Sequence, residues 1–150
     1  MKWLALGIAL ISIVPDFAEA EVITRCGASK GTSWYFFGPM VSREKSGWNE
    51  DGISQGEILL ILDRGDADIV YTDAFGTRSS RGDGGTVVLL SENSAPGFVL
   101  ALAVYPQTAT AEHYVFQLDQ AGNGLVMWGT ARAGGAIQKS TLLQARCRKP

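Results

Sequence analysis

The sequence predicts an all-β domain, an antiparallel meander barrel or sandwich of about eight strands. Two short, almost wholly apolar runs, Thr86–Leu90 and Phe98–Tyr105, flank a turn-forming cluster at Asn93–Gly97. Runs of this kind are typical of central strands that are covered on both faces. Turn residues then recur at intervals of about eight to twelve residues through most of the chain, as in sandwiches and barrels.

Met1–Ala20 has the pattern of a secretory signal peptide. A basic residue precedes the apolar run Trp3–Val14, and Ala18 and Ala20 are the small residues that signal peptidase reads. The apolar run is too short to span a membrane. We therefore expect cleavage before Glu21, no membrane span afterwards, and a periplasmic or secreted protein.

The mature chain, residues 21–150, is expected to form one domain that is close to electrically neutral. Removal of the signal peptide takes away one of the 13 basic and two of the 15 acidic residues, which leaves a formal charge of −1. Nucleic acids and anionic membranes bind basic surfaces. We therefore expect no nucleic acid as partner. We expect a monomer whose partner is a protein or a small polar ligand of the cell envelope.

The two cysteines, Cys26 and Cys147, lie near the two ends of the mature chain. In an exported protein an even pair is most simply a disulfide. Arginines flank both cysteines, so in extended strands the arginines point away from the thiols. We infer from this alternation that the first and last strands lie side by side with their cysteines facing inward. The alternative is a metal site or a redox pair, but two isolated thiols lack the spacing of either.

Alternating or apolar patterns place the individual strands, and turn residues separate them. A turn at Ala28–Gly31 separates the first two strands, and Arg64–Asp66 forms the turn of a hairpin. The strands are predicted at Glu21–Gly27, Ser33–Phe37, Glu57–Asp63, Asp68–Phe75, Thr86–Leu90, Phe98–Tyr105, His113–Leu118, Leu125–Arg132 and Ala136–Cys147.

Two segments, Gly38–Gly56 and Gly76–Gly85, lack strand or helix periodicity and are predicted as loops. Long loops in compact domains are often functional. Together they offer an aromatic platform and hydrogen-bonding groups, a composition that suits a small polar ligand or a protein partner. The alternative is two polar loops without a binding role. The predicted binding residues are Trp48, Asn49, Asp51, Ser80, Arg81 and Asp83.

Catalytic signatures are weak, and we assign no catalytic residue. His113 is the only histidine; it stands in an alternating strand, and no Gly-x-Ser-x-Gly elbow accompanies it. Carboxylates that the fold brings together would support a glycosidase-like mechanism. A binding domain without catalysis is therefore the first hypothesis, and an envelope hydrolase is the second. An inhibitor or a structural envelope protein is the third. The carboxylates considered are Glu50, Asp51, Asp73 and Asp83.

Neither a metal nor a cofactor is predicted. Asp63, Asp66 and Asp68 cluster around a turn, but their spacing fits no EF-hand loop. Arg-Gly-Asp occurs at Arg64–Asp66 and again at Arg81–Asp83. Because these residue types favour turns, we interpret both copies as turn chemistry.

Three stretches, CGASKG at Cys26–Gly31, KSGWNEDGIS at Lys45–Ser54 and SSRGDGG at Ser79–Gly85, resemble a family of small exported bacterial proteins without an assigned function. The resemblance spans most of the mature chain and implies a cleaved signal peptide, an envelope or secreted location, and one domain. The disposition is also similar to that of small periplasmic barrels that inhibit lysozymes. Their inhibitory loop sequence is absent, so this second likeness concerns the fold alone.

Overall fold

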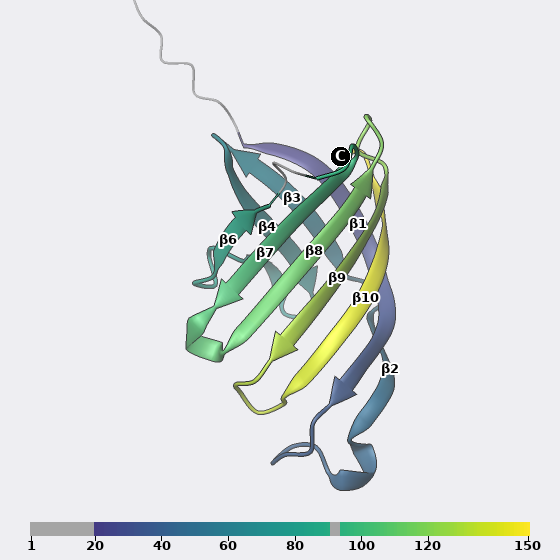
Figure 1. Cartoon of the computed structure of the whole chain (residues 1–150), viewed down its shortest axis with the longest axis vertical. Helices are drawn as coiled ribbons and strands as arrows, with labels where there is room; N and C mark the ends of the chain where they lie inside the picture. Colours follow the sequence, from purple (N-terminus) through teal and green to yellow (C-terminus); the bar gives the residue numbers. More distant parts are fainter. Residues whose placement is uncertain (1–19, 91–93) are drawn as a thin grey trace, which may run out of the picture.

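The computed structural model describes residues 20–90 and 94–150, and this part of the chain is all β (Figure 1). Except for Ala20, the predicted signal peptide lies outside the described residues, and β1 begins directly after it. The strands are β1 (Glu21–Tyr35), β2 (Gly47–Ile53), β3 (Glu57–Asp63), β4 (Asp66–Asp73), β5 (Gly76–Ser79), β6 (Thr86–Leu89), β7 (Phe98–Tyr105), β8 (Thr110–Leu118), β9 (Gly124–Arg132) and β10 (Lys139–Arg148). Two short 3-10 turns, η1 (Arg43–Lys45) and η2 (Pro106–Thr108), complete the described elements.

The strands form one antiparallel sheet in the order β5-β4-β3-β1-β10-β9-β8-β7-β6, with β2 also paired to β1. The sheet curls into a half-barrel that brings β6 next to β4 (Figure 1). The all-β antiparallel prediction is therefore confirmed. No helix in the described part of the chain is long and apolar enough to cross a membrane.

The pairing of β1 with β10 joins the two ends of the chain. The two strands pair antiparallel from Arg25 opposite Arg148 to Tyr35 opposite Lys139. Cys26 and Cys147 face each other in this register, with Cα atoms 3.9 Å apart, and form a disulfide. The predicted disulfide and the predicted adjacency of the first and last strands are both confirmed.

The other edge of β1 pairs with two strands in succession, β3 near its start and β2 near its end. The predicted turn at Ala28–Gly31 is wrong, because β1 continues through it with a register shift between Cys26 and Ser29. The predicted loops at Gly38–Gly56 and Gly76–Gly85 were likewise wrong in part, since they contain β2 and β5. Both strands are mostly exposed and bury no regular apolar face, so they lack the alternation that marks a strand in sequence.

The interior of the half-barrel changes from apolar to polar along its axis. Near the disulfide, Leu60, Ile69, Phe116 and Val126 are fully buried. Further along, the inward positions of the same strands carry hydroxyl and charged groups: β8 passes inward from Phe116 through Tyr114 to Glu112. The apolar end therefore supplies the packed core, and the polar end is left to form a cavity.

A side chain, rather than a backbone ladder, joins β4 to β6, because β5 pairs only with β4 and β6 only with β7. Arg81 Nε donates a hydrogen bond to Ala67 O on β4 (2.7 Å), and Arg81 Nη2 donates one to Val87 O on β6 (3.3 Å). The Ser80 amide also donates to Ile69 O (2.8 Å). We call this junction between β4 and β6 the seam.

Removal of the Cys26–Cys147 disulfide is expected to lower the free energy of unfolding by about 2–5 kcal/mol, since the bond closes a loop of 121 residues in the unfolded chain. Urea denaturation with and without a phosphine reductant measures the loss. Cys26→Ala/Cys147→Ala is the control and should not respond to reductant. An unchanged unfolding midpoint on reduction would contradict the stabilising role.

Arg81→Ala is expected to lower the free energy of unfolding by about 1–2 kcal/mol, because two backbone carbonyls lose a charged donor. The matched control is Arg64→Ala in the other Arg-Gly-Asp copy. Its side chain is largely exposed and bonds only the neighbouring Asp63, so the expected effect is within about 0.5 kcal/mol. Equal losses in the two variants, measured by urea denaturation, would show that the seam does not depend on Arg81.

Candidate functional site

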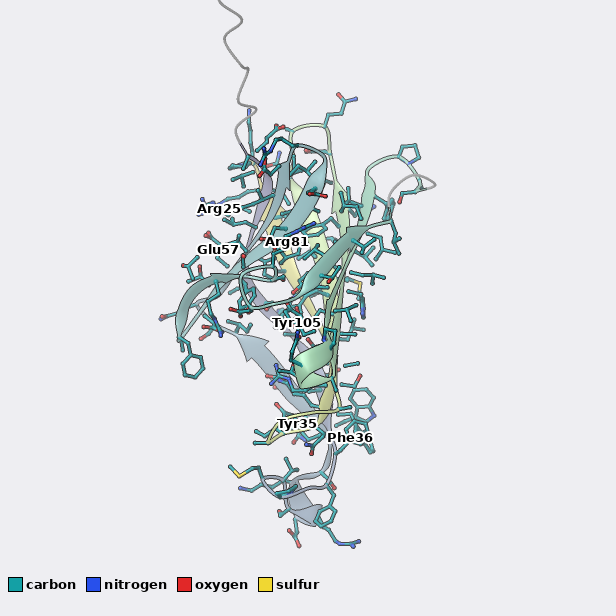
Figure 2. All side chains as sticks on the ribbon, turned by 90° about the vertical axis from the view of Figure 1, so that its left-hand side faces the viewer. Arg25, Tyr35, Phe36, Glu57, Arg81 and Tyr105 are labelled. Carbon is teal, nitrogen blue, oxygen red and sulfur yellow. A yellow bond between two sulfur atoms is a disulfide. The ribbon has the colours of Figure 1, made fainter. Side chains whose placement is uncertain are left out.

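The polar end of the half-barrel encloses a cavity of about 600 Å³, within the range of small-molecule sites. Residues from every strand except β6 line it, together with the turns around Asp83, Thr108 and Gly134. Figure 2 shows Arg81, Tyr105 and Tyr35 in succession along the long axis, from the seam toward the β1–β2 hairpin. The lining combines carboxylates, hydroxyls and basic groups with the aromatic ring of Trp128.

Three hydroxyl groups surround the carboxylate of Glu112 on β8. Tyr114 Oη and Thr130 Oγ1 donate hydrogen bonds to it at 2.7 and 3.0 Å, and Tyr105 Oη lies 3.2 Å away. Tyr105 Oη is also 2.7 Å from Ser80 Oγ. These contacts hold the Glu112 carboxylate inside the cavity, and all the groups that contact it are neutral hydroxyls.

The two tyrosines beside Glu112 remain protonated at physiological pH. Burial, and then the negative charge of Glu112, raise the pKa of Tyr114 well above its usual value. The same two causes raise the pKa of Tyr105. Gly85 leaves room for the Tyr105 ring, because a Cβ at Gly85 would lie 2.7 Å from Tyr105 Cε1.

A stack of aromatic rings forms the wall between the cavity and the core. The Tyr114 ring is nearly parallel to those of Phe116 and Trp128, with centroid distances of 6.4 and 5.9 Å. Trp128 is 9% exposed, and its indole Nε1 is buried with no hydrogen-bond partner among the described residues. A buried donor without an acceptor is uncommon in folded proteins and costs about 1–3 kcal/mol.

A second polar cluster lies where the β1–β2 hairpin meets β10. Asp51 Oδ2 accepts hydrogen bonds from Lys139 Nζ (2.8 Å), Ser33 Oγ (2.5 Å) and Tyr35 Oη (3.0 Å). Burial disfavours ionisation of Asp51, but the hydrogen bonds from Lys139 and Ser33 and the charge of Lys139 outweigh it. They lower the pKa of Asp51 to about 2. Asp51 is therefore a fixed anion that holds β2 to β10.

A third cluster of polar side chains lies on β4, β5 and the turn that follows β5. Tyr71 donates a hydrogen bond to Asp83, and Arg78 pairs with Asp73 at 2.7 Å and with Asp83 at 3.6 Å. Burial and the hydrogen bond to Asp83 raise the pKa of Tyr71, so its hydroxyl also stays protonated. Each carboxylate of this cluster has a basic partner.

Three of the predicted binding residues belong to the cavity or its immediate support. Asp51 and Asp83 both line it, although they lie far apart in the sequence. Ser80 is buried and contacts the hydroxyl of Tyr105, so it supports the lining from behind. The two predicted segments therefore do meet, through these residues, at one concave site.

The other three predicted residues lie elsewhere. Trp48 is 67% exposed on β2 and makes an edge-to-face contact with Trp34, at a centroid distance of 5.6 Å. Asn49 is exposed and bonds backbone carbonyls of its own turn, including Gly47 O at 3.0 Å. Arg81 is engaged in the seam. None of the three lines the cavity.

The sequence reasoning missed Glu112, Trp128, Arg132 and Lys139, all of which line the cavity. One signal was present for Glu112, which alternates in phase with Tyr114 and Phe116 along β8 and so shares their inward face. A charged residue on a face that is otherwise apolar and aromatic marks a polar interior. Arg132 and Lys139 lie at strand ends, where the alternation gives no such signal.

Metal binding has no support in residues 20–90 and 94–150, where no group of three or more His, Cys, Asp or Glu side chains could hold an ion. Part of the acidic DRGDAD cluster instead faces Arg81: Asp66 lies 3.7 Å from its guanidinium, and Asp68 accepts its backbone N–H at 3.2 Å.

Comparison of the chain with protein-family models, with curated proteins and with solved structures gave no match. The function is therefore inferred from the chemistry of the cavity.

The Asp51 cluster predicts a specific loss of stability in acid. Because folding lowers the Asp51 pKa from 3.8 to about 2, its contribution is present above about pH 4 and is lost as the pH falls toward 2. The shift corresponds to about 2 kcal/mol, which solvent screening of this partly exposed group reduces to about 1 kcal/mol.

Asp51→Asn should therefore be less stable than wild type at pH 6 but lose about 1 kcal/mol less between pH 5 and pH 2, as measured by urea unfolding at each pH. Glu50→Gln, which changes an exposed neighbour, is the control and should follow wild type. Parallel pH profiles for wild type and Asp51→Asn would contradict this assignment.

Proposed function

We propose that the protein is an exported binding domain that holds a small polar ligand inside the half-barrel, without catalysis of its own. The observation that carries this proposal is the carboxylate of Glu112, oriented in the cavity by three neutral hydroxyl groups. Polar groups that converge in a preformed cavity and are held by their neighbours are what a ligand site requires.

Binding fits the carboxylates better than hydrolysis does. A glycosidase-type mechanism needs one carboxyl group whose pKa is raised, so that it can act as the general acid. Asp51 has the opposite property, since its pKa is lowered to about 2. Asp73 and Asp83 are both held in ion pairs with the same residue, Arg78.

Export is supported by two independent features. The signal-peptide pattern of Met1–Ala20 predicts secretion. The disulfide between Cys26 and Cys147 is consistent with an oxidising compartment. A periplasmic or secreted location would also give the cavity access to the small polar molecules of the envelope.

Trp128 offers a direct reporter of ligand binding. Trp3 lies in the predicted signal peptide, and the two remaining tryptophans, Trp34 and Trp48, are exposed away from the cavity. Trp34→Phe/Trp48→Phe therefore leaves Trp128 as the only tryptophan of the mature protein. We expect at least one compound from a panel of amino acids, dipeptides, monosaccharides and polyamines to change its fluorescence saturably and to raise the melting temperature.

Glu112→Gln should weaken that response about tenfold or more, because it removes the charge of the central acceptor. The matched control, Glu50→Gln, removes an exposed carboxylate outside the cavity and should leave the response unchanged. The proposal fails if no compound class gives a saturable signal, or if the signal is the same in the Glu112→Gln protein.

A further inference from the structure

Most charges that line the cavity are paired with one another. Asp51 pairs with Lys139, Arg78 pairs with two aspartates, and Glu57 pairs with Arg25. Among the described residues, Glu112 and Arg132 are the cavity-lining charges that take part in no ion pair. The site therefore presents one uncompensated anion and one uncompensated cation.

The register of β8 and β9 places these two residues at neighbouring inward positions. Glu112 lies opposite Thr130, and Arg132 lies opposite Thr110, one inward pair closer to the strand ends. Residues in this diagonal relation have Cα atoms about 7–8 Å apart. The hydroxyls around Glu112 hold its carboxylate within the barrel, and no ion pair with Arg132 forms. A ligand that carries both charges can bridge them.

The environment of each charge indicates which ligand group it receives. Glu112 is partly buried and has only neutral donors, so a cationic group offers the compensation that it lacks. Arg132 is exposed at the end of β9, and a guanidinium can bind a carboxylate through two parallel hydrogen bonds. The deeper lining, with Ile58, Leu143 and Trp128, is apolar or aromatic and suits an aliphatic side chain.

We infer that the ligand is a small zwitterion, an amino acid or a short peptide with free termini. Its ammonium group binds Glu112 and its carboxylate binds Arg132. This inference rests on the proposed binding function and adds the charge pattern of the ligand. A cavity of about 600 Å³ has room for a di- or tripeptide.

Three related probes test the charge pattern: alanyl-alanine, N-acetyl-alanyl-alanine and alanyl-alanine amide. The first carries both charges, the second lacks the ammonium group, and the third lacks the carboxylate. In the Trp34→Phe/Trp48→Phe protein, Trp128 fluorescence should report binding of alanyl-alanine about tenfold or more tighter than that of either capped form.

Two variants assign each preference to one residue. Glu112→Gln should bind alanyl-alanine no better than the N-acetyl form, while it keeps its preference over the amide. Arg132→Gln should show the reverse pattern, and because Arg132 is exposed this variant tests the inference even if Glu112→Gln fails to fold. Glu50→Gln and Arg64→Gln, which change exposed charges outside the cavity, are the controls and should keep both preferences.

The outcomes separate this inference from the proposed function. If glucose or putrescine gives a saturable, Glu112-dependent signal and alanyl-alanine gives none, the protein is a binding domain and the zwitterion inference is overturned. Equal binding of all three alanine probes also overturns it. If no probe binds in any class, both the inference and the proposed function fall.

Discussion

The antiparallel ladder between β1 and β10 is the constraint on which the rest of the structure depends. It joins the two ends of the chain, and the Cys26–Cys147 disulfide fixes its register. With that register fixed, the inward face of β10 follows from simple alternation, which places Leu143 toward the core and Lys139 toward the cavity. Core and site are consequently two ends of one continuous inner surface.

The sequence predicted the strands that bury every second side chain or a continuous apolar run. The apolar run Phe98–Tyr105, bounded by turn residues, predicts a strand. The pair of cysteines in an exported chain predicts the disulfide, and the alternation around them predicts that the end strands are neighbours. β2 was not recognised, because it pairs through its backbone while most of its side chains stay in water. Hydrophobic periodicity reports burial, so a strand without burial gives no signal.

The site was predictable only in part, for a related reason. Asp51 and Asp83 were selected because they lie in non-periodic segments, and both do line the cavity. Trp48 lies in the same non-periodic segment as Asp51, but it is exposed on the outer side of the hairpin and does not line the cavity. The central carboxylate, Glu112, lies in the regular strand β8, whereas the binding residues were predicted only from the non-periodic segments. A concave site inside a curled sheet is built from strand residues, and only the fold shows which of them converge.

The seam is the one junction between neighbouring strands of the half-barrel, among the described residues, that has no backbone ladder. Separating any other pair of neighbouring strands breaks a backbone ladder, whereas separating β6 from β4 breaks mainly the hydrogen bonds of Arg81 and the turn that carries it. Local opening in proteins follows the route of lowest free energy. We therefore expect local opening of this sheet to begin at the seam, where it would uncover the unpaired backbone edge of β6.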